Sequence, residues 1–189
     1  MIVLGIDPSY RRTGLSVVSW QPTNGRYLPG TEHVQCTGVV SAPKRGDSDD
    51  EAYRRKHIAD ACTAWAHTHH VDLVAVEEPC RGLNAATDAM LQRLSATITD
   101  RLSADGHEWV LVNNRKRLRA LGIHGNDSAA LKRAARRAVL TRYGIEVTAD
   151  EADAIGHALA GVRQWLEAQR PAPEQLRLAM SGGRRAKRQ

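Results

Sequence analysis

Two short buried strands of this sequence each end in carboxylates, and this feature constrains the fold most. The first strand reads IVLGID and ends at Asp7, and the second lies within DLVAVEEP (72–79) and ends at Glu77 and Glu78. A carboxylate beside a hydrophobic core loses solvation, so it needs a cationic partner, hydrogen-bond donors or a metal ion. If the two strands are neighbours, Asp7 and Glu77 lie side by side at their carboxyl ends, where open α/β sheets usually bind ligands.

Hydrophobic periodicity predicts the remaining elements. Apolar runs and alternating apolar residues predict further strands, over 14–20, 33–40 and 108–114. Apolar residues at helical spacing predict helices, over 51–69, 84–104, 127–142 and 150–168. The order β-β-β-α-β-α-β-α-α predicts an α/β fold with a mixed central sheet flanked by helices, in which the first three strands are antiparallel.

The length and composition fit one globular domain. With 189 residues, of which 42% are hydrophobic and 25% charged, we expect a single domain over residues 1–169. The remaining residues, 170–189, end in SGGRRAKRQ. This ending has no large apolar side chains to bury, so we expect residues 170–189 to form a basic, disordered tail.

The charge balance suggests a class of partner, and the lack of targeting signals suggests where the protein acts. The formal net charge is +6, which favours an acidic partner, with nucleic acid ahead of a membrane. No apolar run approaches the length of a membrane span, and the first strand lacks the basic lead-in of a signal peptide. The three cysteines are scattered without metal-binding spacing. We therefore expect a soluble, cytoplasmic protein.

A third acidic segment, TADEADAIGHAL, lies near the end of the predicted domain. Asp150 and Asp153 are three residues apart and share one helix face, whereas Glu151 points elsewhere. Four converging carboxylates repel one another unless cations neutralise them, and oxygen-rich clusters suit Mg²⁺ or Mn²⁺. Two such ions about 3.5–4 Å apart can activate a water and stabilise the leaving oxygen of a phosphodiester. The alternative is that strand-end acids are incidental and that Asp150 is only a helix N-cap.

Three segments together resemble the acidic motifs of the RuvC family of Holliday-junction resolvases, which are bacterial or phage-encoded. The segments are GIDPSYRRTG (5–14), VAVEEP (74–79) and ADEADA (149–154), and the likeness extends from residue 1 to about residue 165. The resemblance implies an RNase H-like fold, with three antiparallel strands followed by parallel ones. It also implies a homodimer that uses Mg²⁺ or Mn²⁺ to nick two opposed strands of a four-way DNA junction.

The resemblance also assigns the site residues. The catalytic residues and metal ligands carried over by motif are Asp7, Glu77, Asp150 and Asp153. Catalytic-site lysines of the family have their nearest matches here in Arg117 or Arg119, and in Lys132. His157, one helical turn beyond Asp153, is a candidate for supporting the metals or contacting DNA; the alternative is an ordinary helix-face histidine.

The sequence departs from the family pattern at two places, in the turn after Asp7 and in the segment after Glu77, of which the second concerns the opening of the junction. Ser9 stands where the family usually has glycine, and PCRGLN (79–84) lacks the aromatic residue that wedges into the junction in well-studied members. Arg81 in that segment is a candidate to stack on a base as a planar cation, although an ordinary arginine touching phosphate or water is the preferred explanation.

A basic region between residues 114 and 142 predicts the DNA-binding surface. Its cations outnumber its one acid, Asp127, which favours phosphate binding over a merely solvated helix face. The DNA-binding candidates here are Arg115, Lys116, Arg117, Arg119, Lys132, Arg133, Arg136 and Arg137. The predicted helix over 84–104 is expected to form the dimer seam, because its apolar stripe with Met90, Leu91, Leu94 and Ile98 is wider than one sheet face needs. The alternative is that this helix only covers the sheet of its own subunit.

Other classes of function remain as alternatives to a metal-dependent crossover junction endonuclease. An actin-like or sugar-kinase-like ATPase has a similar first loop but needs two such domains. A relaxed nuclease that cuts forks, flaps or RNA–DNA hybrids keeps the chemistry and changes the substrate. A non-catalytic junction-binding module requires the carboxylates to be structural only.

Overall fold

The structure is a computed structural model that describes residues 1–21, 30–44, 46, 49–79, 82, 84–125 and 127–169. Two of the sequence predictions, the role of Arg81 and the disordered tail over 170–189, lie outside the described residues.

The helices and strands follow the predicted order with one addition. The strands are β1 (Ile2–Asp7), β2 (Thr13–Trp20), β3 (Glu32–Val40), β4 (Leu73–Glu77) and β5 (Trp109–Val112). The helices are α1 (Asp50–Thr68), α2 (Ala85–Ala104), α3 (Asn114–Ala120), α4 (Ser128–Tyr143) and α5 (Ala149–Gln169). Every predicted element is present, and α3 is the one that the periodicity missed. None of the described helices combines the length and the apolar character that crossing a membrane requires.

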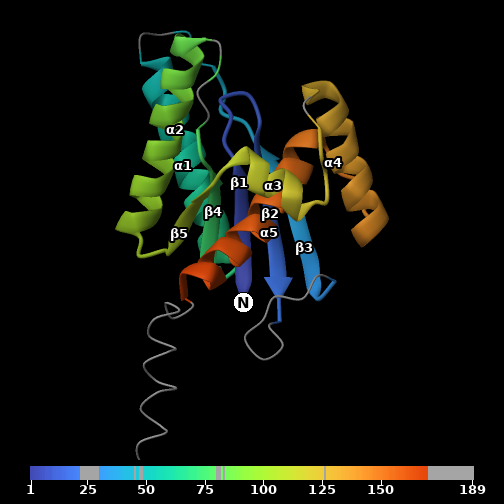
Figure 1. Ribbon diagram of the computed structural model, residues 1–189. Helices are drawn as coiled ribbons and strands as arrows, with labels where there is room; N and C mark the ends of the chain where they lie inside the picture. The colour runs from blue at the N-terminus through green and yellow to red at the C-terminus, as the bar shows by residue number, and fades with distance from the viewer. Residues whose placement is uncertain are drawn as a thin grey trace, which may run out of the picture.

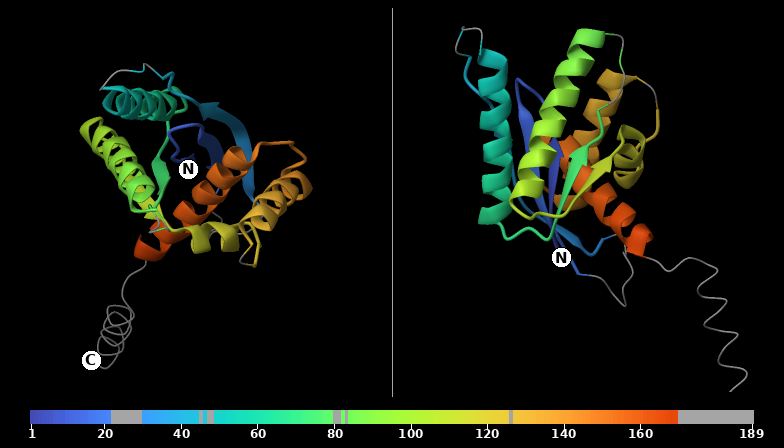
Figure 2. Two further views of the ribbon diagram at one scale, coloured as in Figure 1. Left: turned by 90° about the horizontal axis from the view of Figure 1, so that it is seen from above. Right: turned by 90° about the vertical axis from the view of Figure 1, so that its left-hand side faces the viewer.

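The five strands form one mixed sheet in the order β3-β2-β1-β4-β5. β1 pairs antiparallel with β2, and β2 antiparallel with β3, whereas β1–β4 and β4–β5 are parallel. The predicted α/β fold with three antiparallel strands followed by parallel ones is therefore confirmed. Helices α1 and α2 cover one face of the sheet, and α5 crosses the other face with α3 and α4 beside it (Figures 1 and 2).

Helix α5 packs unusually close to the sheet because two glycines lie beneath it. A Cβ atom on Gly5 of β1 would overlap the backbone carbonyl of Ala154, and one on Gly14 of β2 would overlap that of Asp150. Only glycine allows the helix backbone to approach this closely. The contact places the first turns of α5, with their acids, directly beside the carboxyl end of β1.

The apolar stripe of α2 is used inside its own subunit. Leu94 and Ile98 are fully buried in the cluster formed by α1, α2 and the sheet, and Met90 packs partly buried against the same cluster. Helix α1 packs beside α2, so Leu94 and Ile98 are not available for a dimer seam. Leu91 is only half-buried and stands outside the buried clusters, so a seam at that position stays a prediction.

Candidate active site

The carboxyl ends of β1 and β4 bring the first two acids together. These strands are parallel neighbours, with Ile6 opposite Val76, so Asp7 and Glu77 follow at the same edge of the sheet. Asp7 and Glu77 each offer a carboxylate oxygen, and His157 offers a ring nitrogen. These three atoms lie within 4.8 Å of one another. The predicted meeting of Asp7 with Glu77 is confirmed, and His157 of α5 joins them.

The start of α5 is fixed by a reciprocal cap in which Asp150 takes no part. The Thr148 hydroxyl accepts from the Glu151 amide at 3.3 Å, and the Glu151 carboxylate accepts from the Thr148 amide at 2.8 Å. This is a capping box. Glu151 also accepts from the Thr37 hydroxyl of β3 at 2.9 Å. The alternative that Asp150 is the N-cap is therefore wrong, and Glu151 is structural, as its direction on the helix predicted.

Asp153 lies at the site but is already paired. The residue is 5% exposed, and its carboxylate forms an ion pair with the buried guanidinium of Arg117, which α3 supplies. The Asp153 charge also raises the pKa values of Asp7 and Glu77, whereas Arg117 lowers both. Asp153 therefore belongs to the same electrostatic cluster, with Arg117 as its internal cation.

The acids of the cluster are poorly compensated even with Arg117 present. Burial raises the pKa of Asp7 well above its ordinary value, and the neighbouring Glu77 raises it further. Burial also raises the pKa of Glu77. A buried pair of this kind holds a proton or attracts a cation, because two bare carboxylates in a poorly solvated place repel each other.

His157 faces the acids from a fully buried position on α5. Its Nε2 lies 4.0 Å from Asp7 Oδ1. Burial lowers the pKa of the imidazole well below its ordinary value, and the nearby Arg117 lowers it further. The ring is therefore neutral at physiological pH, the form in which imidazole binds metals.

Asp150 stands at the margin of the cluster. Its carboxylate pairs with Arg12 of the β1–β2 loop, with 3.2 Å between Arg12 Nε and Asp150 Oδ2. It borders a surface hollow of about 490 Å³ whose lining includes Arg12, Arg136 and Thr148. Among the described residues, the structure thus brings Asp7 and Glu77 together, couples Asp153 to them electrostatically, and leaves Asp150 paired with Arg12.

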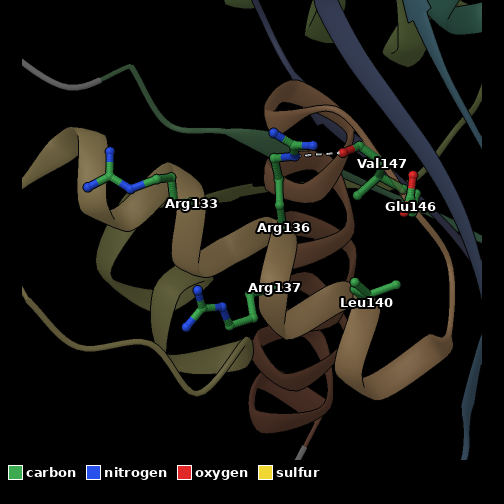
Figure 3. A pocket seen from close by; sticks show the side chains of 6 residues that line it. All are labelled: Arg133, Arg136, Arg137, Leu140, Glu146 and Val147. Carbon is green, nitrogen blue, oxygen red and sulfur yellow. Dashed lines mark hydrogen bonds between the residues drawn. The ribbon is translucent and has the colours of Figure 1, made fainter.

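The predicted DNA-binding residues fall into two groups. Arg117 is buried in the acidic site, whereas Arg115, Lys116, Arg119, Lys132, Arg133, Arg136 and Arg137 are exposed on α3 and α4. Arg136 is anchored, because its Nε donates to the Val147 carbonyl at 3.0 Å (Figure 3). A second hollow of about 260 Å³ lies here and shares Arg136, Glu146 and Val147 with the one at Asp150. The two hollows thus connect the edge of the acidic site to the basic face of α4.

Sequence reasoning missed α3 and Arg12. The signal for α3 was Asn113, whose side chain accepts from the Lys116 amide at 3.0 Å as an N-cap, but the seven-residue helix is dominated by charge. Arg12 lies only five residues after Asp7, in a loop whose direction the sequence does not define. His157 was selected by its spacing from Asp153, although its closeness to Asp7 was not foreseen.

The sequence and the fold are similar to those of known junction resolvases. A family model described as crossover junction endodeoxyribonuclease RuvC matches residues 3–99. The chain is 34% identical to the protein of that name from Salinibacter ruber over 96 residues, 51% of this chain and 48% of that protein. It is 34% identical to the Mycobacterium tuberculosis protein over 87 residues, 46% of this chain and 42% of that protein. The chain thus spans about half the length of the curated relatives it matches.

Solved structures extend the likeness of fold beyond residue 99. The Thermus thermophilus RuvC structure solved with a Holliday junction substrate has a TM-score of 0.66 at 19% identity, covering 85% of this chain and 92% of that one. The yeast mitochondrial Holliday junction resolvase has a TM-score of 0.58 at 12% identity, covering 89% and 81%. At these identities the likeness concerns the fold, including the part that carries α5.

Proposed function

The chain belongs to the RuvC family, and from this premise we propose that it is a metal-dependent endonuclease that resolves Holliday junctions. The observation that carries the proposal is the convergence of Asp7, Glu77, Asp153 and His157 at one end of the sheet in a protein of net charge +6. Buried carboxylates with raised pKa values serve metal-assisted hydrolysis, and the positive charge serves a polyanionic substrate.

The residues of the acidic site fit divalent cations. Asp7 and Glu77 offer oxygen donors, which Mg²⁺ and Mn²⁺ prefer, and their raised pKa values mark a need for positive charge. We assign Asp7, Glu77 and Asp153 as ligands, with Asp150 joining them from the margin, and infer two ions per site. The chemistry that such ions supply when bound is activation of a water and stabilisation of the leaving oxygen.

Arg117 and Lys132 are the basic residues that the proposal places at the reacting phosphate. Arg117 is buried beside Asp153, and the charge of Lys132 lowers the pKa of Glu77, so both cations reach the cluster. Arg119 is exposed on α3 and is the weaker candidate. With Asp153 among the metal ligands, the guanidinium of Arg117 would be free to bind two phosphate oxygens in a bidentate manner.

The DNA backbone is proposed to run from the acidic site along α4. The connected hollows carry Arg12 and Arg136, and the exposed Arg133 and Arg137 line the outer one (Figure 3). Cations spaced along a helix face neutralise successive phosphates without reading sequence. Arg115, Lys116 and Arg119 on α3 extend this surface, and Arg81, which lies outside the described residues, is a further candidate.

Resolution of a four-way junction requires two symmetric nicks, so we further propose a homodimer acting in the cytoplasm. A two-fold dimer sets two identical sites against one junction. Because Leu94 and Ile98 are buried within the subunit, a seam on α2 would use the half-buried Leu91 with exposed residues such as Gln92, Arg93 and Ala96.

A relaxed nuclease acting on forks, flaps or RNA–DNA hybrids is the second candidate function. It is favoured by one observation, the absence of an aromatic residue from PCRGLN after β4. Without an aromatic wedge, the opening of a junction has to come from charge and shape alone.

A panel of labelled four-way junctions, forks, flaps, hybrids and plain duplexes tests the proposal. We expect paired, symmetric cuts in the four-way junction with Mg²⁺ or Mn²⁺, and none in EDTA. Equal cutting of forks and flaps would favour the relaxed nuclease. Tight junction binding without cleavage under any metal would leave a binding module.

A further inference from the structure

The imidazole of His157 is buried beside the acids without a hydrogen-bond partner. Its exposed fraction is 0%, and neither ring nitrogen has a partner among the described residues. A neutral imidazole carries one donor and one acceptor nitrogen, and burying both unpaired is costly. Buried polar groups without a protein partner mark places where a water or an ion completes the contacts.

The position of the ring suits a shared cation. His157 Nε2 lies 4.0 Å from Asp7 Oδ1, and a Glu77 oxygen completes a set within 4.8 Å. Two ligand atoms bound to one cation at about 2.1 Å are about 3 to 4 Å apart, depending on the angle between them. The three atoms are therefore near the separation at which one ion contacts them all.

The backbone that carries His157 is held rigidly. The neighbouring turn of α5 packs on Gly5, where an added Cβ would lie 2.8 Å from the Ala158 nitrogen. A Cβ atom added at Gly156 would lie 2.6 Å from Arg117 Cγ and 2.9 Å from Leu121 Cδ1. A ligand on a rigid helix is positioned before the metal arrives, which is a property of effective metal sites.

We propose that His157 is a direct nitrogen ligand of the ion held by Asp7 and Glu77, making this a mixed nitrogen–oxygen centre that prefers Mn²⁺ to Mg²⁺. Imidazole suits transition ions, whereas Mg²⁺ takes oxygen ligands and keeps several waters. The inference rests on the proposed function only in treating the acidic site as a metal site. His157 then binds the ion directly, rather than only orienting the residues that bind it.

Pulsed electron paramagnetic resonance of the Mn²⁺-loaded full chain tests the inference directly. We expect modulation from a coordinated imidazole nitrogen in the wild type, and its loss in His157→Gln. The Mn²⁺ dissociation constant of His157→Gln should rise by about 10- to 100-fold or more, the cost of losing even a supporting side chain, with a smaller rise for Mg²⁺. His107→Gln is the matched control: His107 also has a buried, unpartnered Nε2, lies outside the site and should leave the signal unchanged.

The outcomes separate this inference from the proposed function. If the wild type binds Mn²⁺ but shows no nitrogen modulation, His157 is not a ligand, even if the protein cuts junctions. This measurement uses the wild type alone, so it does not depend on whether a variant folds. Nitrogen modulation in a protein that cuts no junction would support the ligand and overturn the function. Asp7→Asn should lose tight Mn²⁺ binding; modulation that persists in it would place the ion elsewhere and overturn the inference.

Discussion

The acidic site and the basic face of α4 are both charged, yet they differ in how their charges are compensated. At the acidic site, Asp7 and Glu77 are largely desolvated, and their raised pKa values record a shortage of positive charge. On α4, Arg133 and Arg137 are exposed to water. Burying a charge costs free energy, so buried charges are kept mainly where the chemistry of a site requires them. An exposed charge costs little and can bind the phosphates of DNA. Substitutions in the two regions should therefore change different measurements.

The largest expected effect is the loss of cleavage in Asp7→Asn. Removing a metal ligand from such a centre should reduce the rate of junction nicking by several orders of magnitude, because catalysis depends on positioned ions. Junction binding should persist or tighten, because negative charge near the phosphates is removed. Single-turnover nicking and a gel-shift titration measure the two properties separately.

The same pattern is expected for Glu77→Gln and Asp153→Asn, and a smaller loss for Asp150→Asn because Asp150 stands at the margin of the cluster. Glu78→Gln and Glu151→Gln are matched controls with nearly unchanged rates. Glutamine at position 151 keeps the capping-box acceptor. Asp7→Asn that nicks at the wild-type rate would remove the acidic site from the mechanism.

The next effect belongs to the basic face and should appear in binding alone. Changing Arg133 and Arg137 together to alanine should raise the junction dissociation constant on the order of tenfold. It should lower the slope of log K against log salt by about two. Duplex binding should weaken in parallel, and the nicking rate at saturating enzyme should stay the same. These two positions are preferred because Arg136 is anchored to Val147 and the charge of Lys132 influences the pKa of Glu77.

Lys56→Ala is the control for this pair, because Lys56 is a surface cation of α1 on the opposite side of the sheet, paired with Asp60. Its salt slope should equal that of the wild type. If the double variant also keeps the wild-type slope, α4 is only a solvated helix face and the DNA lies elsewhere.

The two regions also differ in how far the sequence could predict them. The strands that carry Asp7 and Glu77 are continuous apolar runs, so their burial and the convergence of their ends were readable. The environment of Asp150 could not be predicted from the sequence, because its pairing with Arg12 depends on the path of a loop. Helix α3 was hidden because seven residues hold too few apolar positions for periodicity. The burial of Arg117 beside Asp153 was therefore not foreseen, although Arg117 was a candidate for both the catalytic site and DNA binding.

The α2 stripe shows a different limit. Counting apolar residues on a helix gives the width of its buried face but not the number of neighbours that cover it. Leu94 and Ile98 were assigned to a partner subunit, whereas α1 of the same subunit takes that place. Packing between helices is set by tertiary contacts that a single periodic pattern does not specify.

A third prediction uses the same acids in the absence of metal. A carboxyl group whose pKa is raised by folding stabilises the folded state while protonated, below its unfolded pKa of about 3.9, and this contribution is lost as the pH rises through the folded pKa. Asp7 should thus destabilise the metal-free protein at neutral pH. We expect Asp7→Asn in EDTA to melt above the wild type near pH 7, with a difference that shrinks as the pH falls.

Thermal unfolding between pH 4 and 8 measures this difference, and Glu78→Gln, an exposed neighbour, should show none. Added Mn²⁺ should reverse the order, because bound ligand stabilises only the protein that binds it. A lower melting temperature for metal-free Asp7→Asn at neutral pH would mean that Arg117 already compensates the cluster.

The smallest predicted effect tests whether the cap of α5 holds the acids in place. Thr148→Ala removes the hydroxyl that accepts from the Glu151 amide and should cost about 1 kcal/mol of unfolding free energy. In a chain of this size that lowers the melting temperature by about 2–4 °C. Thr148→Ser keeps the acceptor and should behave as the wild type.

Because Asp150 and Asp153 lie in the first two turns of α5, fraying of this helix end should also weaken Mn²⁺ binding modestly, as titration calorimetry would detect. Lost stability with unchanged Mn²⁺ affinity would mean that the packing of α5 on Gly5 and Gly14, rather than its cap, positions the acids.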